Sequence, residues 1–137
     1  MAQNGYQQYQ KSNVTLASPE ALVVLLYSEL LRCLTGAKVA LLNNDKNTKN
    51  KSTAKAIRIL AELMVSLNME KGEGVAWNLV ILYEHISIRL LQASRDPTPE
   101  PFDEAIRLLA PLKEAWETIA VPKSALLKTA GLERVVV

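Results

Sequence analysis

The stretch that decides the fold is LNMEKGEGVAWNLVILYEHISIRLLQA, residues 67–93. It opens with two closely spaced glycines, Gly72 and Gly74, which release a preceding helix and let the chain turn. The chain then continues to Ala93 without another glycine or any proline, which predicts one long helix. Apolar residues recur along it at steps of three and four, so they line one side: Val75, Leu79, Leu82, Ile86, Leu90 and Ala93.

The same helix carries a second apolar stripe, rotated away from the first, made of Trp77, Ile81, Ile88 and Leu91. A surface helix that packs on one layer needs only one apolar stripe. Two stripes indicate that this helix either is central to its bundle or lends its second face to a partner. For Trp77 the sequence leaves core packing and partner binding equally open.

Length and composition indicate a single helical domain. A chain of 137 residues that is 49% apolar can bury one sizeable core. Five glycines and six prolines supply little material for the many turns of an all-β fold, and an aromatic content of 5% argues the same way. The composition therefore favours an all-α domain.

The first helix has a clear start. Ser18 is a good N-cap, Pro19 suits the first helical position, and Glu20 faces the positive end of the helix dipole. Apolar periodicity continues to about Leu42, which predicts the end of the helix there.

Asn43 to Lys51 is rich in asparagine and lysine, which predicts a loop. Thr48 or Ser52 would then cap a second helix that continues to about Asn68. Its expected inner stripe is Ile57, Leu60, Ala61, Met64 and Leu67. The two residues off that stripe, Ile59 and Leu63, are left for another surface.

Asp96-Pro97-Thr98-Pro99 ends the third helix and begins a fourth. The fourth has a regular heptad seam: Phe102, Ala105, Leu109, Leu112, Trp116 and Ile119. This seam favours Trp116 in the core, and Pro111 within it predicts a bend over 107–111.

Four such helices joined by short loops predict an antiparallel up-down four-helix bundle over 18–120, with an N-terminal arm (1–17) and a C-terminal extension (121–137).

The sequence contains few residues that could form a catalytic or metal-binding site. His85 is the only histidine and Cys33 the only thiol, too few N and S ligands for a metal site. Gly72-Glu73-Gly74 lacks the Gly-Lys-Ser/Thr ending of a phosphate loop and follows a helix, so it predicts a helix–helix turn. We therefore expect no enzyme, no metal and no cofactor.

The sequence also bears on the cellular location of the protein and on whether it binds membranes or nucleic acid. A lone cysteine fits the reducing cytoplasm, and the N-terminus lacks the pattern of a secretory signal. The longest wholly apolar run of the first helix, Ala21 to Tyr27, is too short to span a bilayer. The net charge is only +2, and the lysine-rich loop lacks interleaved aromatics, which favours a solvated loop over a nucleic-acid site.

Three segments together resemble the flagellin export chaperones, the FliS family. They are SLNMEKGEGVAWNLVILYEHISIRLLQA (66–93), the opening NGYQQYQ with TLASPEALVVLLY (4–10 and 15–27), and LKEAW (112–116). The resemblance implies a helical bundle that binds the disordered C-terminal segment of flagellin in the cytosol. It also implies that the protein prevents premature polymerisation and delivers flagellin to the flagellar type III export apparatus. The residues alone equally allow a structural or regulatory homodimer.

Apolar residues off the inner stripes are the predicted flagellin-binding surface: Ile59, Leu63, Trp77, Ile81 and Ile88. The resemblance further implies that the N-terminal arm covers this surface before flagellin displaces it, through Tyr6, Tyr9 and Leu16. The residues alone equally allow a disordered polar tail.

Overall fold

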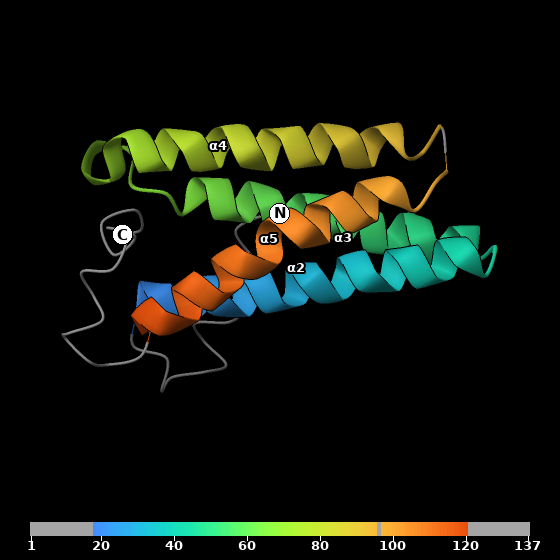
Figure 1. The fold of residues 1–137 in the computed structure, drawn as a ribbon, viewed down its shortest axis with the longest axis horizontal. Helices are drawn as coiled ribbons and strands as arrows, with labels where there is room; N and C mark the ends of the chain where they lie inside the picture. Colours follow the sequence, from blue (N-terminus) through green and yellow to red (C-terminus); the bar gives the residue numbers. More distant parts are fainter. Residues whose placement is uncertain (1–17, 96, 121–137) are drawn as a thin grey trace.

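The computed structural model of the chain describes residues 18–95 and 97–120 (Figure 1). These residues form four α-helices and no β-strand, which confirms the all-α prediction: α2 (Pro19–Leu42), α3 (Lys46–Val65), α4 (Met69–Gln92) and α5 (Glu100–Ala120). The predicted arm and the predicted extension, with Tyr6, Tyr9 and Leu16, lie outside the described residues.

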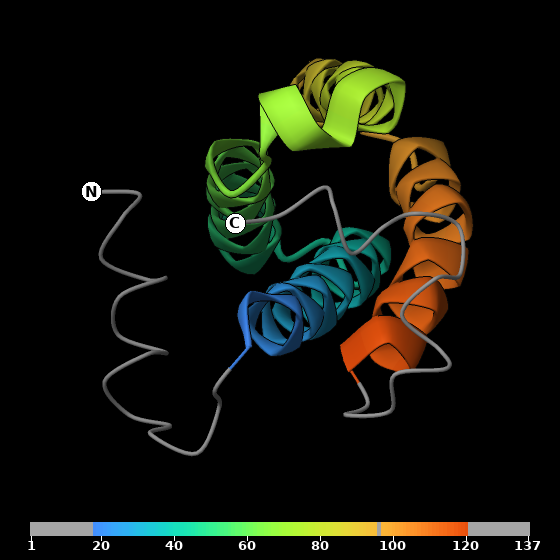
Figure 2. The same ribbon diagram turned by 90° about the vertical axis from the view of Figure 1, so that its left-hand side faces the viewer.

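The four helices form a bundle in which successive helices run in opposite directions (Figure 1). Seen end-on, α2 and α4 lie on opposite sides of the bundle, with α3 and α5 between them (Figure 2). Accordingly, α2 packs against α3 and α5, and so does α4. The up-down arrangement leaves each helix with one face towards the core and one face away from it.

The start of α2 is as the sequence predicts. The Ser18 hydroxyl accepts a hydrogen bond from the Ala21 amide at 3.1 Å, and Pro19 is the first helical residue. The helix ends at Leu42, also as predicted.

The predicted loop over 43–51 is wrong, because α3 already begins at Lys46. The N-cap of α3 is Asp45 and not Thr48 or Ser52 as predicted. The Asp45 carboxylate accepts a hydrogen bond from the Thr48 amide at 3.1 Å. Only Asn43–Asp45 connects α2 to α3, and Asn44 takes the positive φ (60°) that this short turn requires. The lysine-rich segment is therefore the first part of a helix.

The turn between α3 and α4 also lies earlier than predicted. The chain turns at Ser66–Asn68, and the Asn68 side chain caps α4 by accepting from the Lys71 amide at 3.0 Å. The glycine pair instead flanks a kink inside α4 at Glu73, where φ is 47° and ψ is −127°. Such a backbone is strained for a residue with a Cβ atom.

The core is centred on large aromatic residues. The Tyr27 and Tyr83 hydroxyls lie 2.6 Å apart, and their rings meet edge-on with centroids 6.4 Å apart. Burial raises the pKa of Tyr27 to about 12, against opposing effects of the Tyr83 hydrogen bond and of Trp116. Trp116 is fully buried, as its place in the heptad seam predicts, but its Nε1 lacks the geometry of a hydrogen bond to any described residue. The aromatic core therefore joins α2, α4 and α5.

Candidate partner-binding surface

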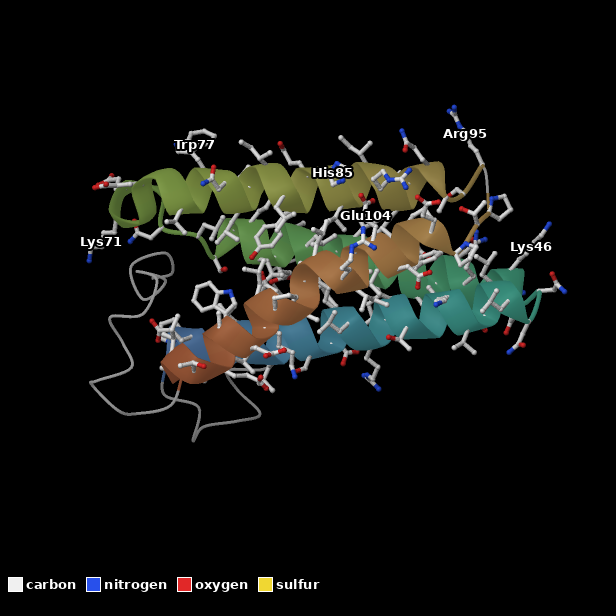
Figure 3. All side chains as sticks on the ribbon, in the orientation of Figure 1. Lys46, Lys71, Trp77, His85, Arg95 and Glu104 are labelled. Atoms are coloured by element: carbon white, nitrogen blue, oxygen red, sulfur yellow. The ribbon has the colours of Figure 1, made fainter. Side chains whose placement is uncertain are left out.

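The outer face of α4 exposes four large apolar side chains: Trp77 (60%), Ile81 (61%), Ile88 (56%) and Leu91 (58%). We call these four residues the α4 stripe. Their spacing of four, seven and three residues places them on one side of the helix. Figure 3 shows Trp77 pointing away from the other three helices. The second apolar stripe predicted from the sequence is therefore an outer surface and not part of the core.

The opposite face of α4 supplies its share of the core. Ala76, Leu79, Tyr83, Ile86 and Leu90 are all buried. The α4 stripe therefore lies outside the core of the bundle. A helix with two apolar faces, of which only one is covered, has a surface suited to a partner.

Covering the α4 stripe would be a useful source of binding energy. Burying one exposed aliphatic side chain gains about 1.5–3 kcal/mol when the burial is complete. Partial burial of the four side chains therefore offers on the order of 5 kcal/mol, before the loss of translational and rotational freedom is deducted. This is enough to anchor a helical segment but not to define its sequence.

Polar contacts between α4 and α5 lie beside the stripe. Glu104 of α5 accepts a hydrogen bond from Arg89 Nε at 2.9 Å and faces His85 Nε2 at 3.4 Å (Figure 3). The hydrogen bond from Arg89 lowers the pKa of Glu104, and His85 acts in the same direction. Since His85 and Arg89 both contact Glu104, the flank of α4 that carries them faces α5, which is consistent with the outward position of the α4 stripe.

The structure separates the five predicted binding residues into two groups. Trp77, Ile81 and Ile88 lie together on the α4 stripe. Ile59 and Leu63 are only 6% and 1% exposed, so the prediction that they lie off the inner face of α3 is wrong.

The error concerns which face of α3 points inward. The buried apolar face of α3 contains Ala56, Ile59, Leu60 and Leu63, whereas Ile57 and Met64 pack at its edge. Both faces carry aliphatic residues at helical spacing, so periodicity alone could not choose between them. Leu91 was the residue left out of the predicted site, although its position three residues after Ile88 was sufficient to include it.

The described residues offer little material for catalysis. Over 18–95 and 97–120, no group of three or more His, Cys, Asp or Glu side chains could hold a metal ion. Cys33 is buried, and burial raises the pKa of its thiol. None of the four helices is both long enough and apolar enough to cross a membrane.

A helical bundle with one apolar helix face turned outward defines a class of helical binding proteins. The particular family follows from comparison with known sequences. The chain belongs to the family described as flagellar protein FliS, whose family model matches residues 2–124.

Individual relatives agree with this assignment. The chain is 35% identical over 115 residues to the flagellar secretion chaperone FliS of Salmonella typhimurium, covering 83% of this chain and 84% of that protein. It is 32% identical over 108 residues to the Escherichia coli protein of the same name, covering 78% and 79%. For the Bacillus subtilis protein the identity is 29% over 115 residues, covering 84% and 85%. By family membership the chain is a flagellar export chaperone and not an enzyme.

Proposed function

We propose that this chaperone acts in the cytosol and binds the C-terminal segment of flagellin on the α4 stripe. Three of the predicted binding residues, Trp77, Ile81 and Ile88, form this surface together with Leu91. The observation that carries the proposal is the exposure of all four residues on one face of a helix whose other face is buried.

The proposed role follows from the chemistry of such a surface. A segment that later polymerises must present apolar residues to its neighbours, and a chaperone that covers them suppresses early self-association. An amphipathic helix laid along α4 would place its own apolar residues against the α4 stripe. The bound flagellin would then be delivered to the flagellar type III export apparatus.

The N-terminal arm is proposed to be a removable cover of the same surface. Tyr6, Tyr9 and Leu16 are the apolar residues that would compete with flagellin for it. A second copy of the chain is the other candidate occupant, because an apolar stripe can also bury itself against its own symmetry mate. Flagellin binding and homodimer formation would then exclude one another.

The fluorescence of Trp77 offers a test of this proposal. Trp77 is exposed and Trp116 is fully buried, so an aqueous quencher should reach mainly Trp77. Saturation with a tryptophan-free peptide of the flagellin C-terminal segment should shift the emission to shorter wavelength and protect it from the quencher. Sedimentation of the same samples should show one chain with one peptide. Binding without any protection of Trp77 would show that the peptide lies elsewhere.

A further inference from the structure

A cavity of about 770 Å³ opens at the end of the bundle where α2 meets α3 and where α4 leads to α5. Figure 3 places Lys46 and Arg95 at this end, far along the bundle from Trp77. Part of the wall is apolar and includes Leu42, Ile57 and Pro97. The cavity therefore combines an apolar wall with cationic side chains.

Lys49 is the unusual residue of this cavity. It lines the cavity, yet the residue is only 7% exposed. Its backbone is fully engaged, since its amide donates to the Asp45 carbonyl and its carbonyl accepts from the Thr53 hydroxyl. Its ammonium group forms no hydrogen bond or ion pair with any of the described residues. Its stem is covered, whereas its ammonium group keeps contact with solvent and can pair with an anionic partner.

The described residues around the cavity do not supply that partner. Among the described residues of the wall, Lys46, Lys49 and Arg95 are the cationic ones, and Asp45 is the only carboxylate. Asp45 is already used as the N-cap of α3, where it accepts from the Thr48 amide. The described wall thus has an excess of two positive charges and lacks a matching anion.

The cavity also continues the proposed binding surface. Leu91 is the last residue of the α4 stripe and at the same time part of the cavity wall. A segment lying along α4 from Trp77 to Leu91 would therefore bring its end to the cavity. Its next side chains would meet both the apolar part of the wall and the cationic side chains of Lys46, Lys49 and Arg95.

We propose that this cavity receives a carboxylate from the amphipathic peptide segment that binds along α4. The carboxylate would be either an acidic side chain near the end of the segment or the α-carboxylate of its last residue. Both present the same anion on an apolar body, which matches the charged and apolar parts of the wall. This inference rests on the proposed function. It adds the direction in which the bound segment lies along α4 and one specific contact.

The test is a thermodynamic cycle between the peptide and Lys49. Calorimetry would compare the free-acid flagellin C-terminal peptide with its C-terminal amide and with variants whose acidic side chains are replaced by amides. Against the unaltered protein, loss of the recognised carboxylate should weaken binding about tenfold, equivalent to about 1.4 kcal/mol. Against Lys49→Met, which keeps the apolar stem, the acid and the amide should bind equally. The peptide variant that shows the effect distinguishes the two sources of the carboxylate.

Controls separate this inference from the proposed function. Lys51→Met removes an exposed lysine outside the cavity and should leave the difference between acid and amide intact. Arg95→Gln removes a cavity charge at an exposed position, so it tests the same idea if Lys49→Met fails to fold. An acid–amide difference that persists in folded Lys49→Met, or in Arg95→Gln if Lys49→Met does not fold, would overturn the inference and leave the α4 stripe intact as a proposal. Failure of every peptide to bind would overturn both.

Inorganic phosphate is the alternative occupant. If phosphate binds the unaltered protein but not Lys49→Met, and if it leaves peptide affinity unchanged, the cavity is a phosphate site and the inference is wrong. Competition between phosphate and the free-acid peptide, but not the amide, is the expected result.

Discussion

Removal of one hydroxyl from the buried tyrosine pair should destabilise the bundle more than removal of both. The Tyr27 and Tyr83 hydroxyls are 2.6 Å apart, and both residues are almost completely buried. Tyr27→Phe leaves the Tyr83 hydroxyl in the core without its partner, and an unpaired buried hydroxyl costs about 1–3 kcal/mol. For a chain of this size that corresponds to a melting temperature lower by roughly 4 °C per kcal/mol.

The double variant, Tyr27→Phe with Tyr83→Phe, removes both polar groups and should recover most of this loss. Its stability should lie within about 1 kcal/mol of the unaltered protein, because neither hydroxyl remains to be satisfied. Urea unfolding followed by circular dichroism gives the four free energies of the cycle. If the double variant loses the sum of the two single losses, the hydroxyls do not act as a pair and the reasoning fails.

The other predictions concern the kink, an ion pair and the arm. Glu73→Gly should raise the free energy of unfolding by about 1 kcal/mol, because glycine adopts φ near 47° without strain. The control Glu70→Gly replaces a residue with helical backbone angles and should lower the free energy of unfolding. Urea unfolding measures both variants. Arg89 lowers the pKa of Glu104 in the folded protein below the value of about 4.3 that an unfolded glutamate has. The stabilisation from Glu104 is therefore complete above about pH 4.3 and is lost as the pH falls through the folded pKa. Glu104→Gln should therefore make the loss of stability in acid less steep, and an unchanged pH profile would contradict this. Deletion of residues 1–15 should tighten binding of the flagellin peptide or promote dimers, measured by calorimetry and sedimentation, and no change in either would argue against a cover.

Much of the fold could be predicted because the decisive signals are local. Ser18 and Pro19 specify the start of α2 through hydrogen bonding and backbone geometry that involve only neighbouring residues. The α4 stripe was also visible, since two separate sets of apolar residues share one helix. The prediction that Trp77, Ile81 and Ile88 lie off the inner stripe agrees with their exposure, although the sequence left core packing and partner binding equally open for Trp77.

The incorrect predictions arose where two local signals compete. Asp45, Thr48 and Ser52 are all acceptable N-caps, and capping by Asp45 starts α3 at Lys46, so the lysine-rich segment is helical. In α3, aliphatic residues occur on two faces, and contacts with neighbouring helices decide that Ile59 and Leu63 are core residues. The cavity beside Lys49 depends on the meeting of distant chain segments, which no local pattern predicts.

The most direct test of the account is the affinity of the flagellin C-terminal peptide for Ile81→Asp and Val39→Asp. Both residues are large, exposed and helical, but Ile81 lies on the α4 stripe and Val39 lies on α2. Because Ile81 is exposed, its replacement should leave the circular dichroism spectrum unchanged while placing a charge at the centre of the proposed interface. We predict at least a tenfold loss of affinity for Ile81→Asp and less than a twofold change for Val39→Asp. Equal affinities of the two variants, with both folded, would contradict the account.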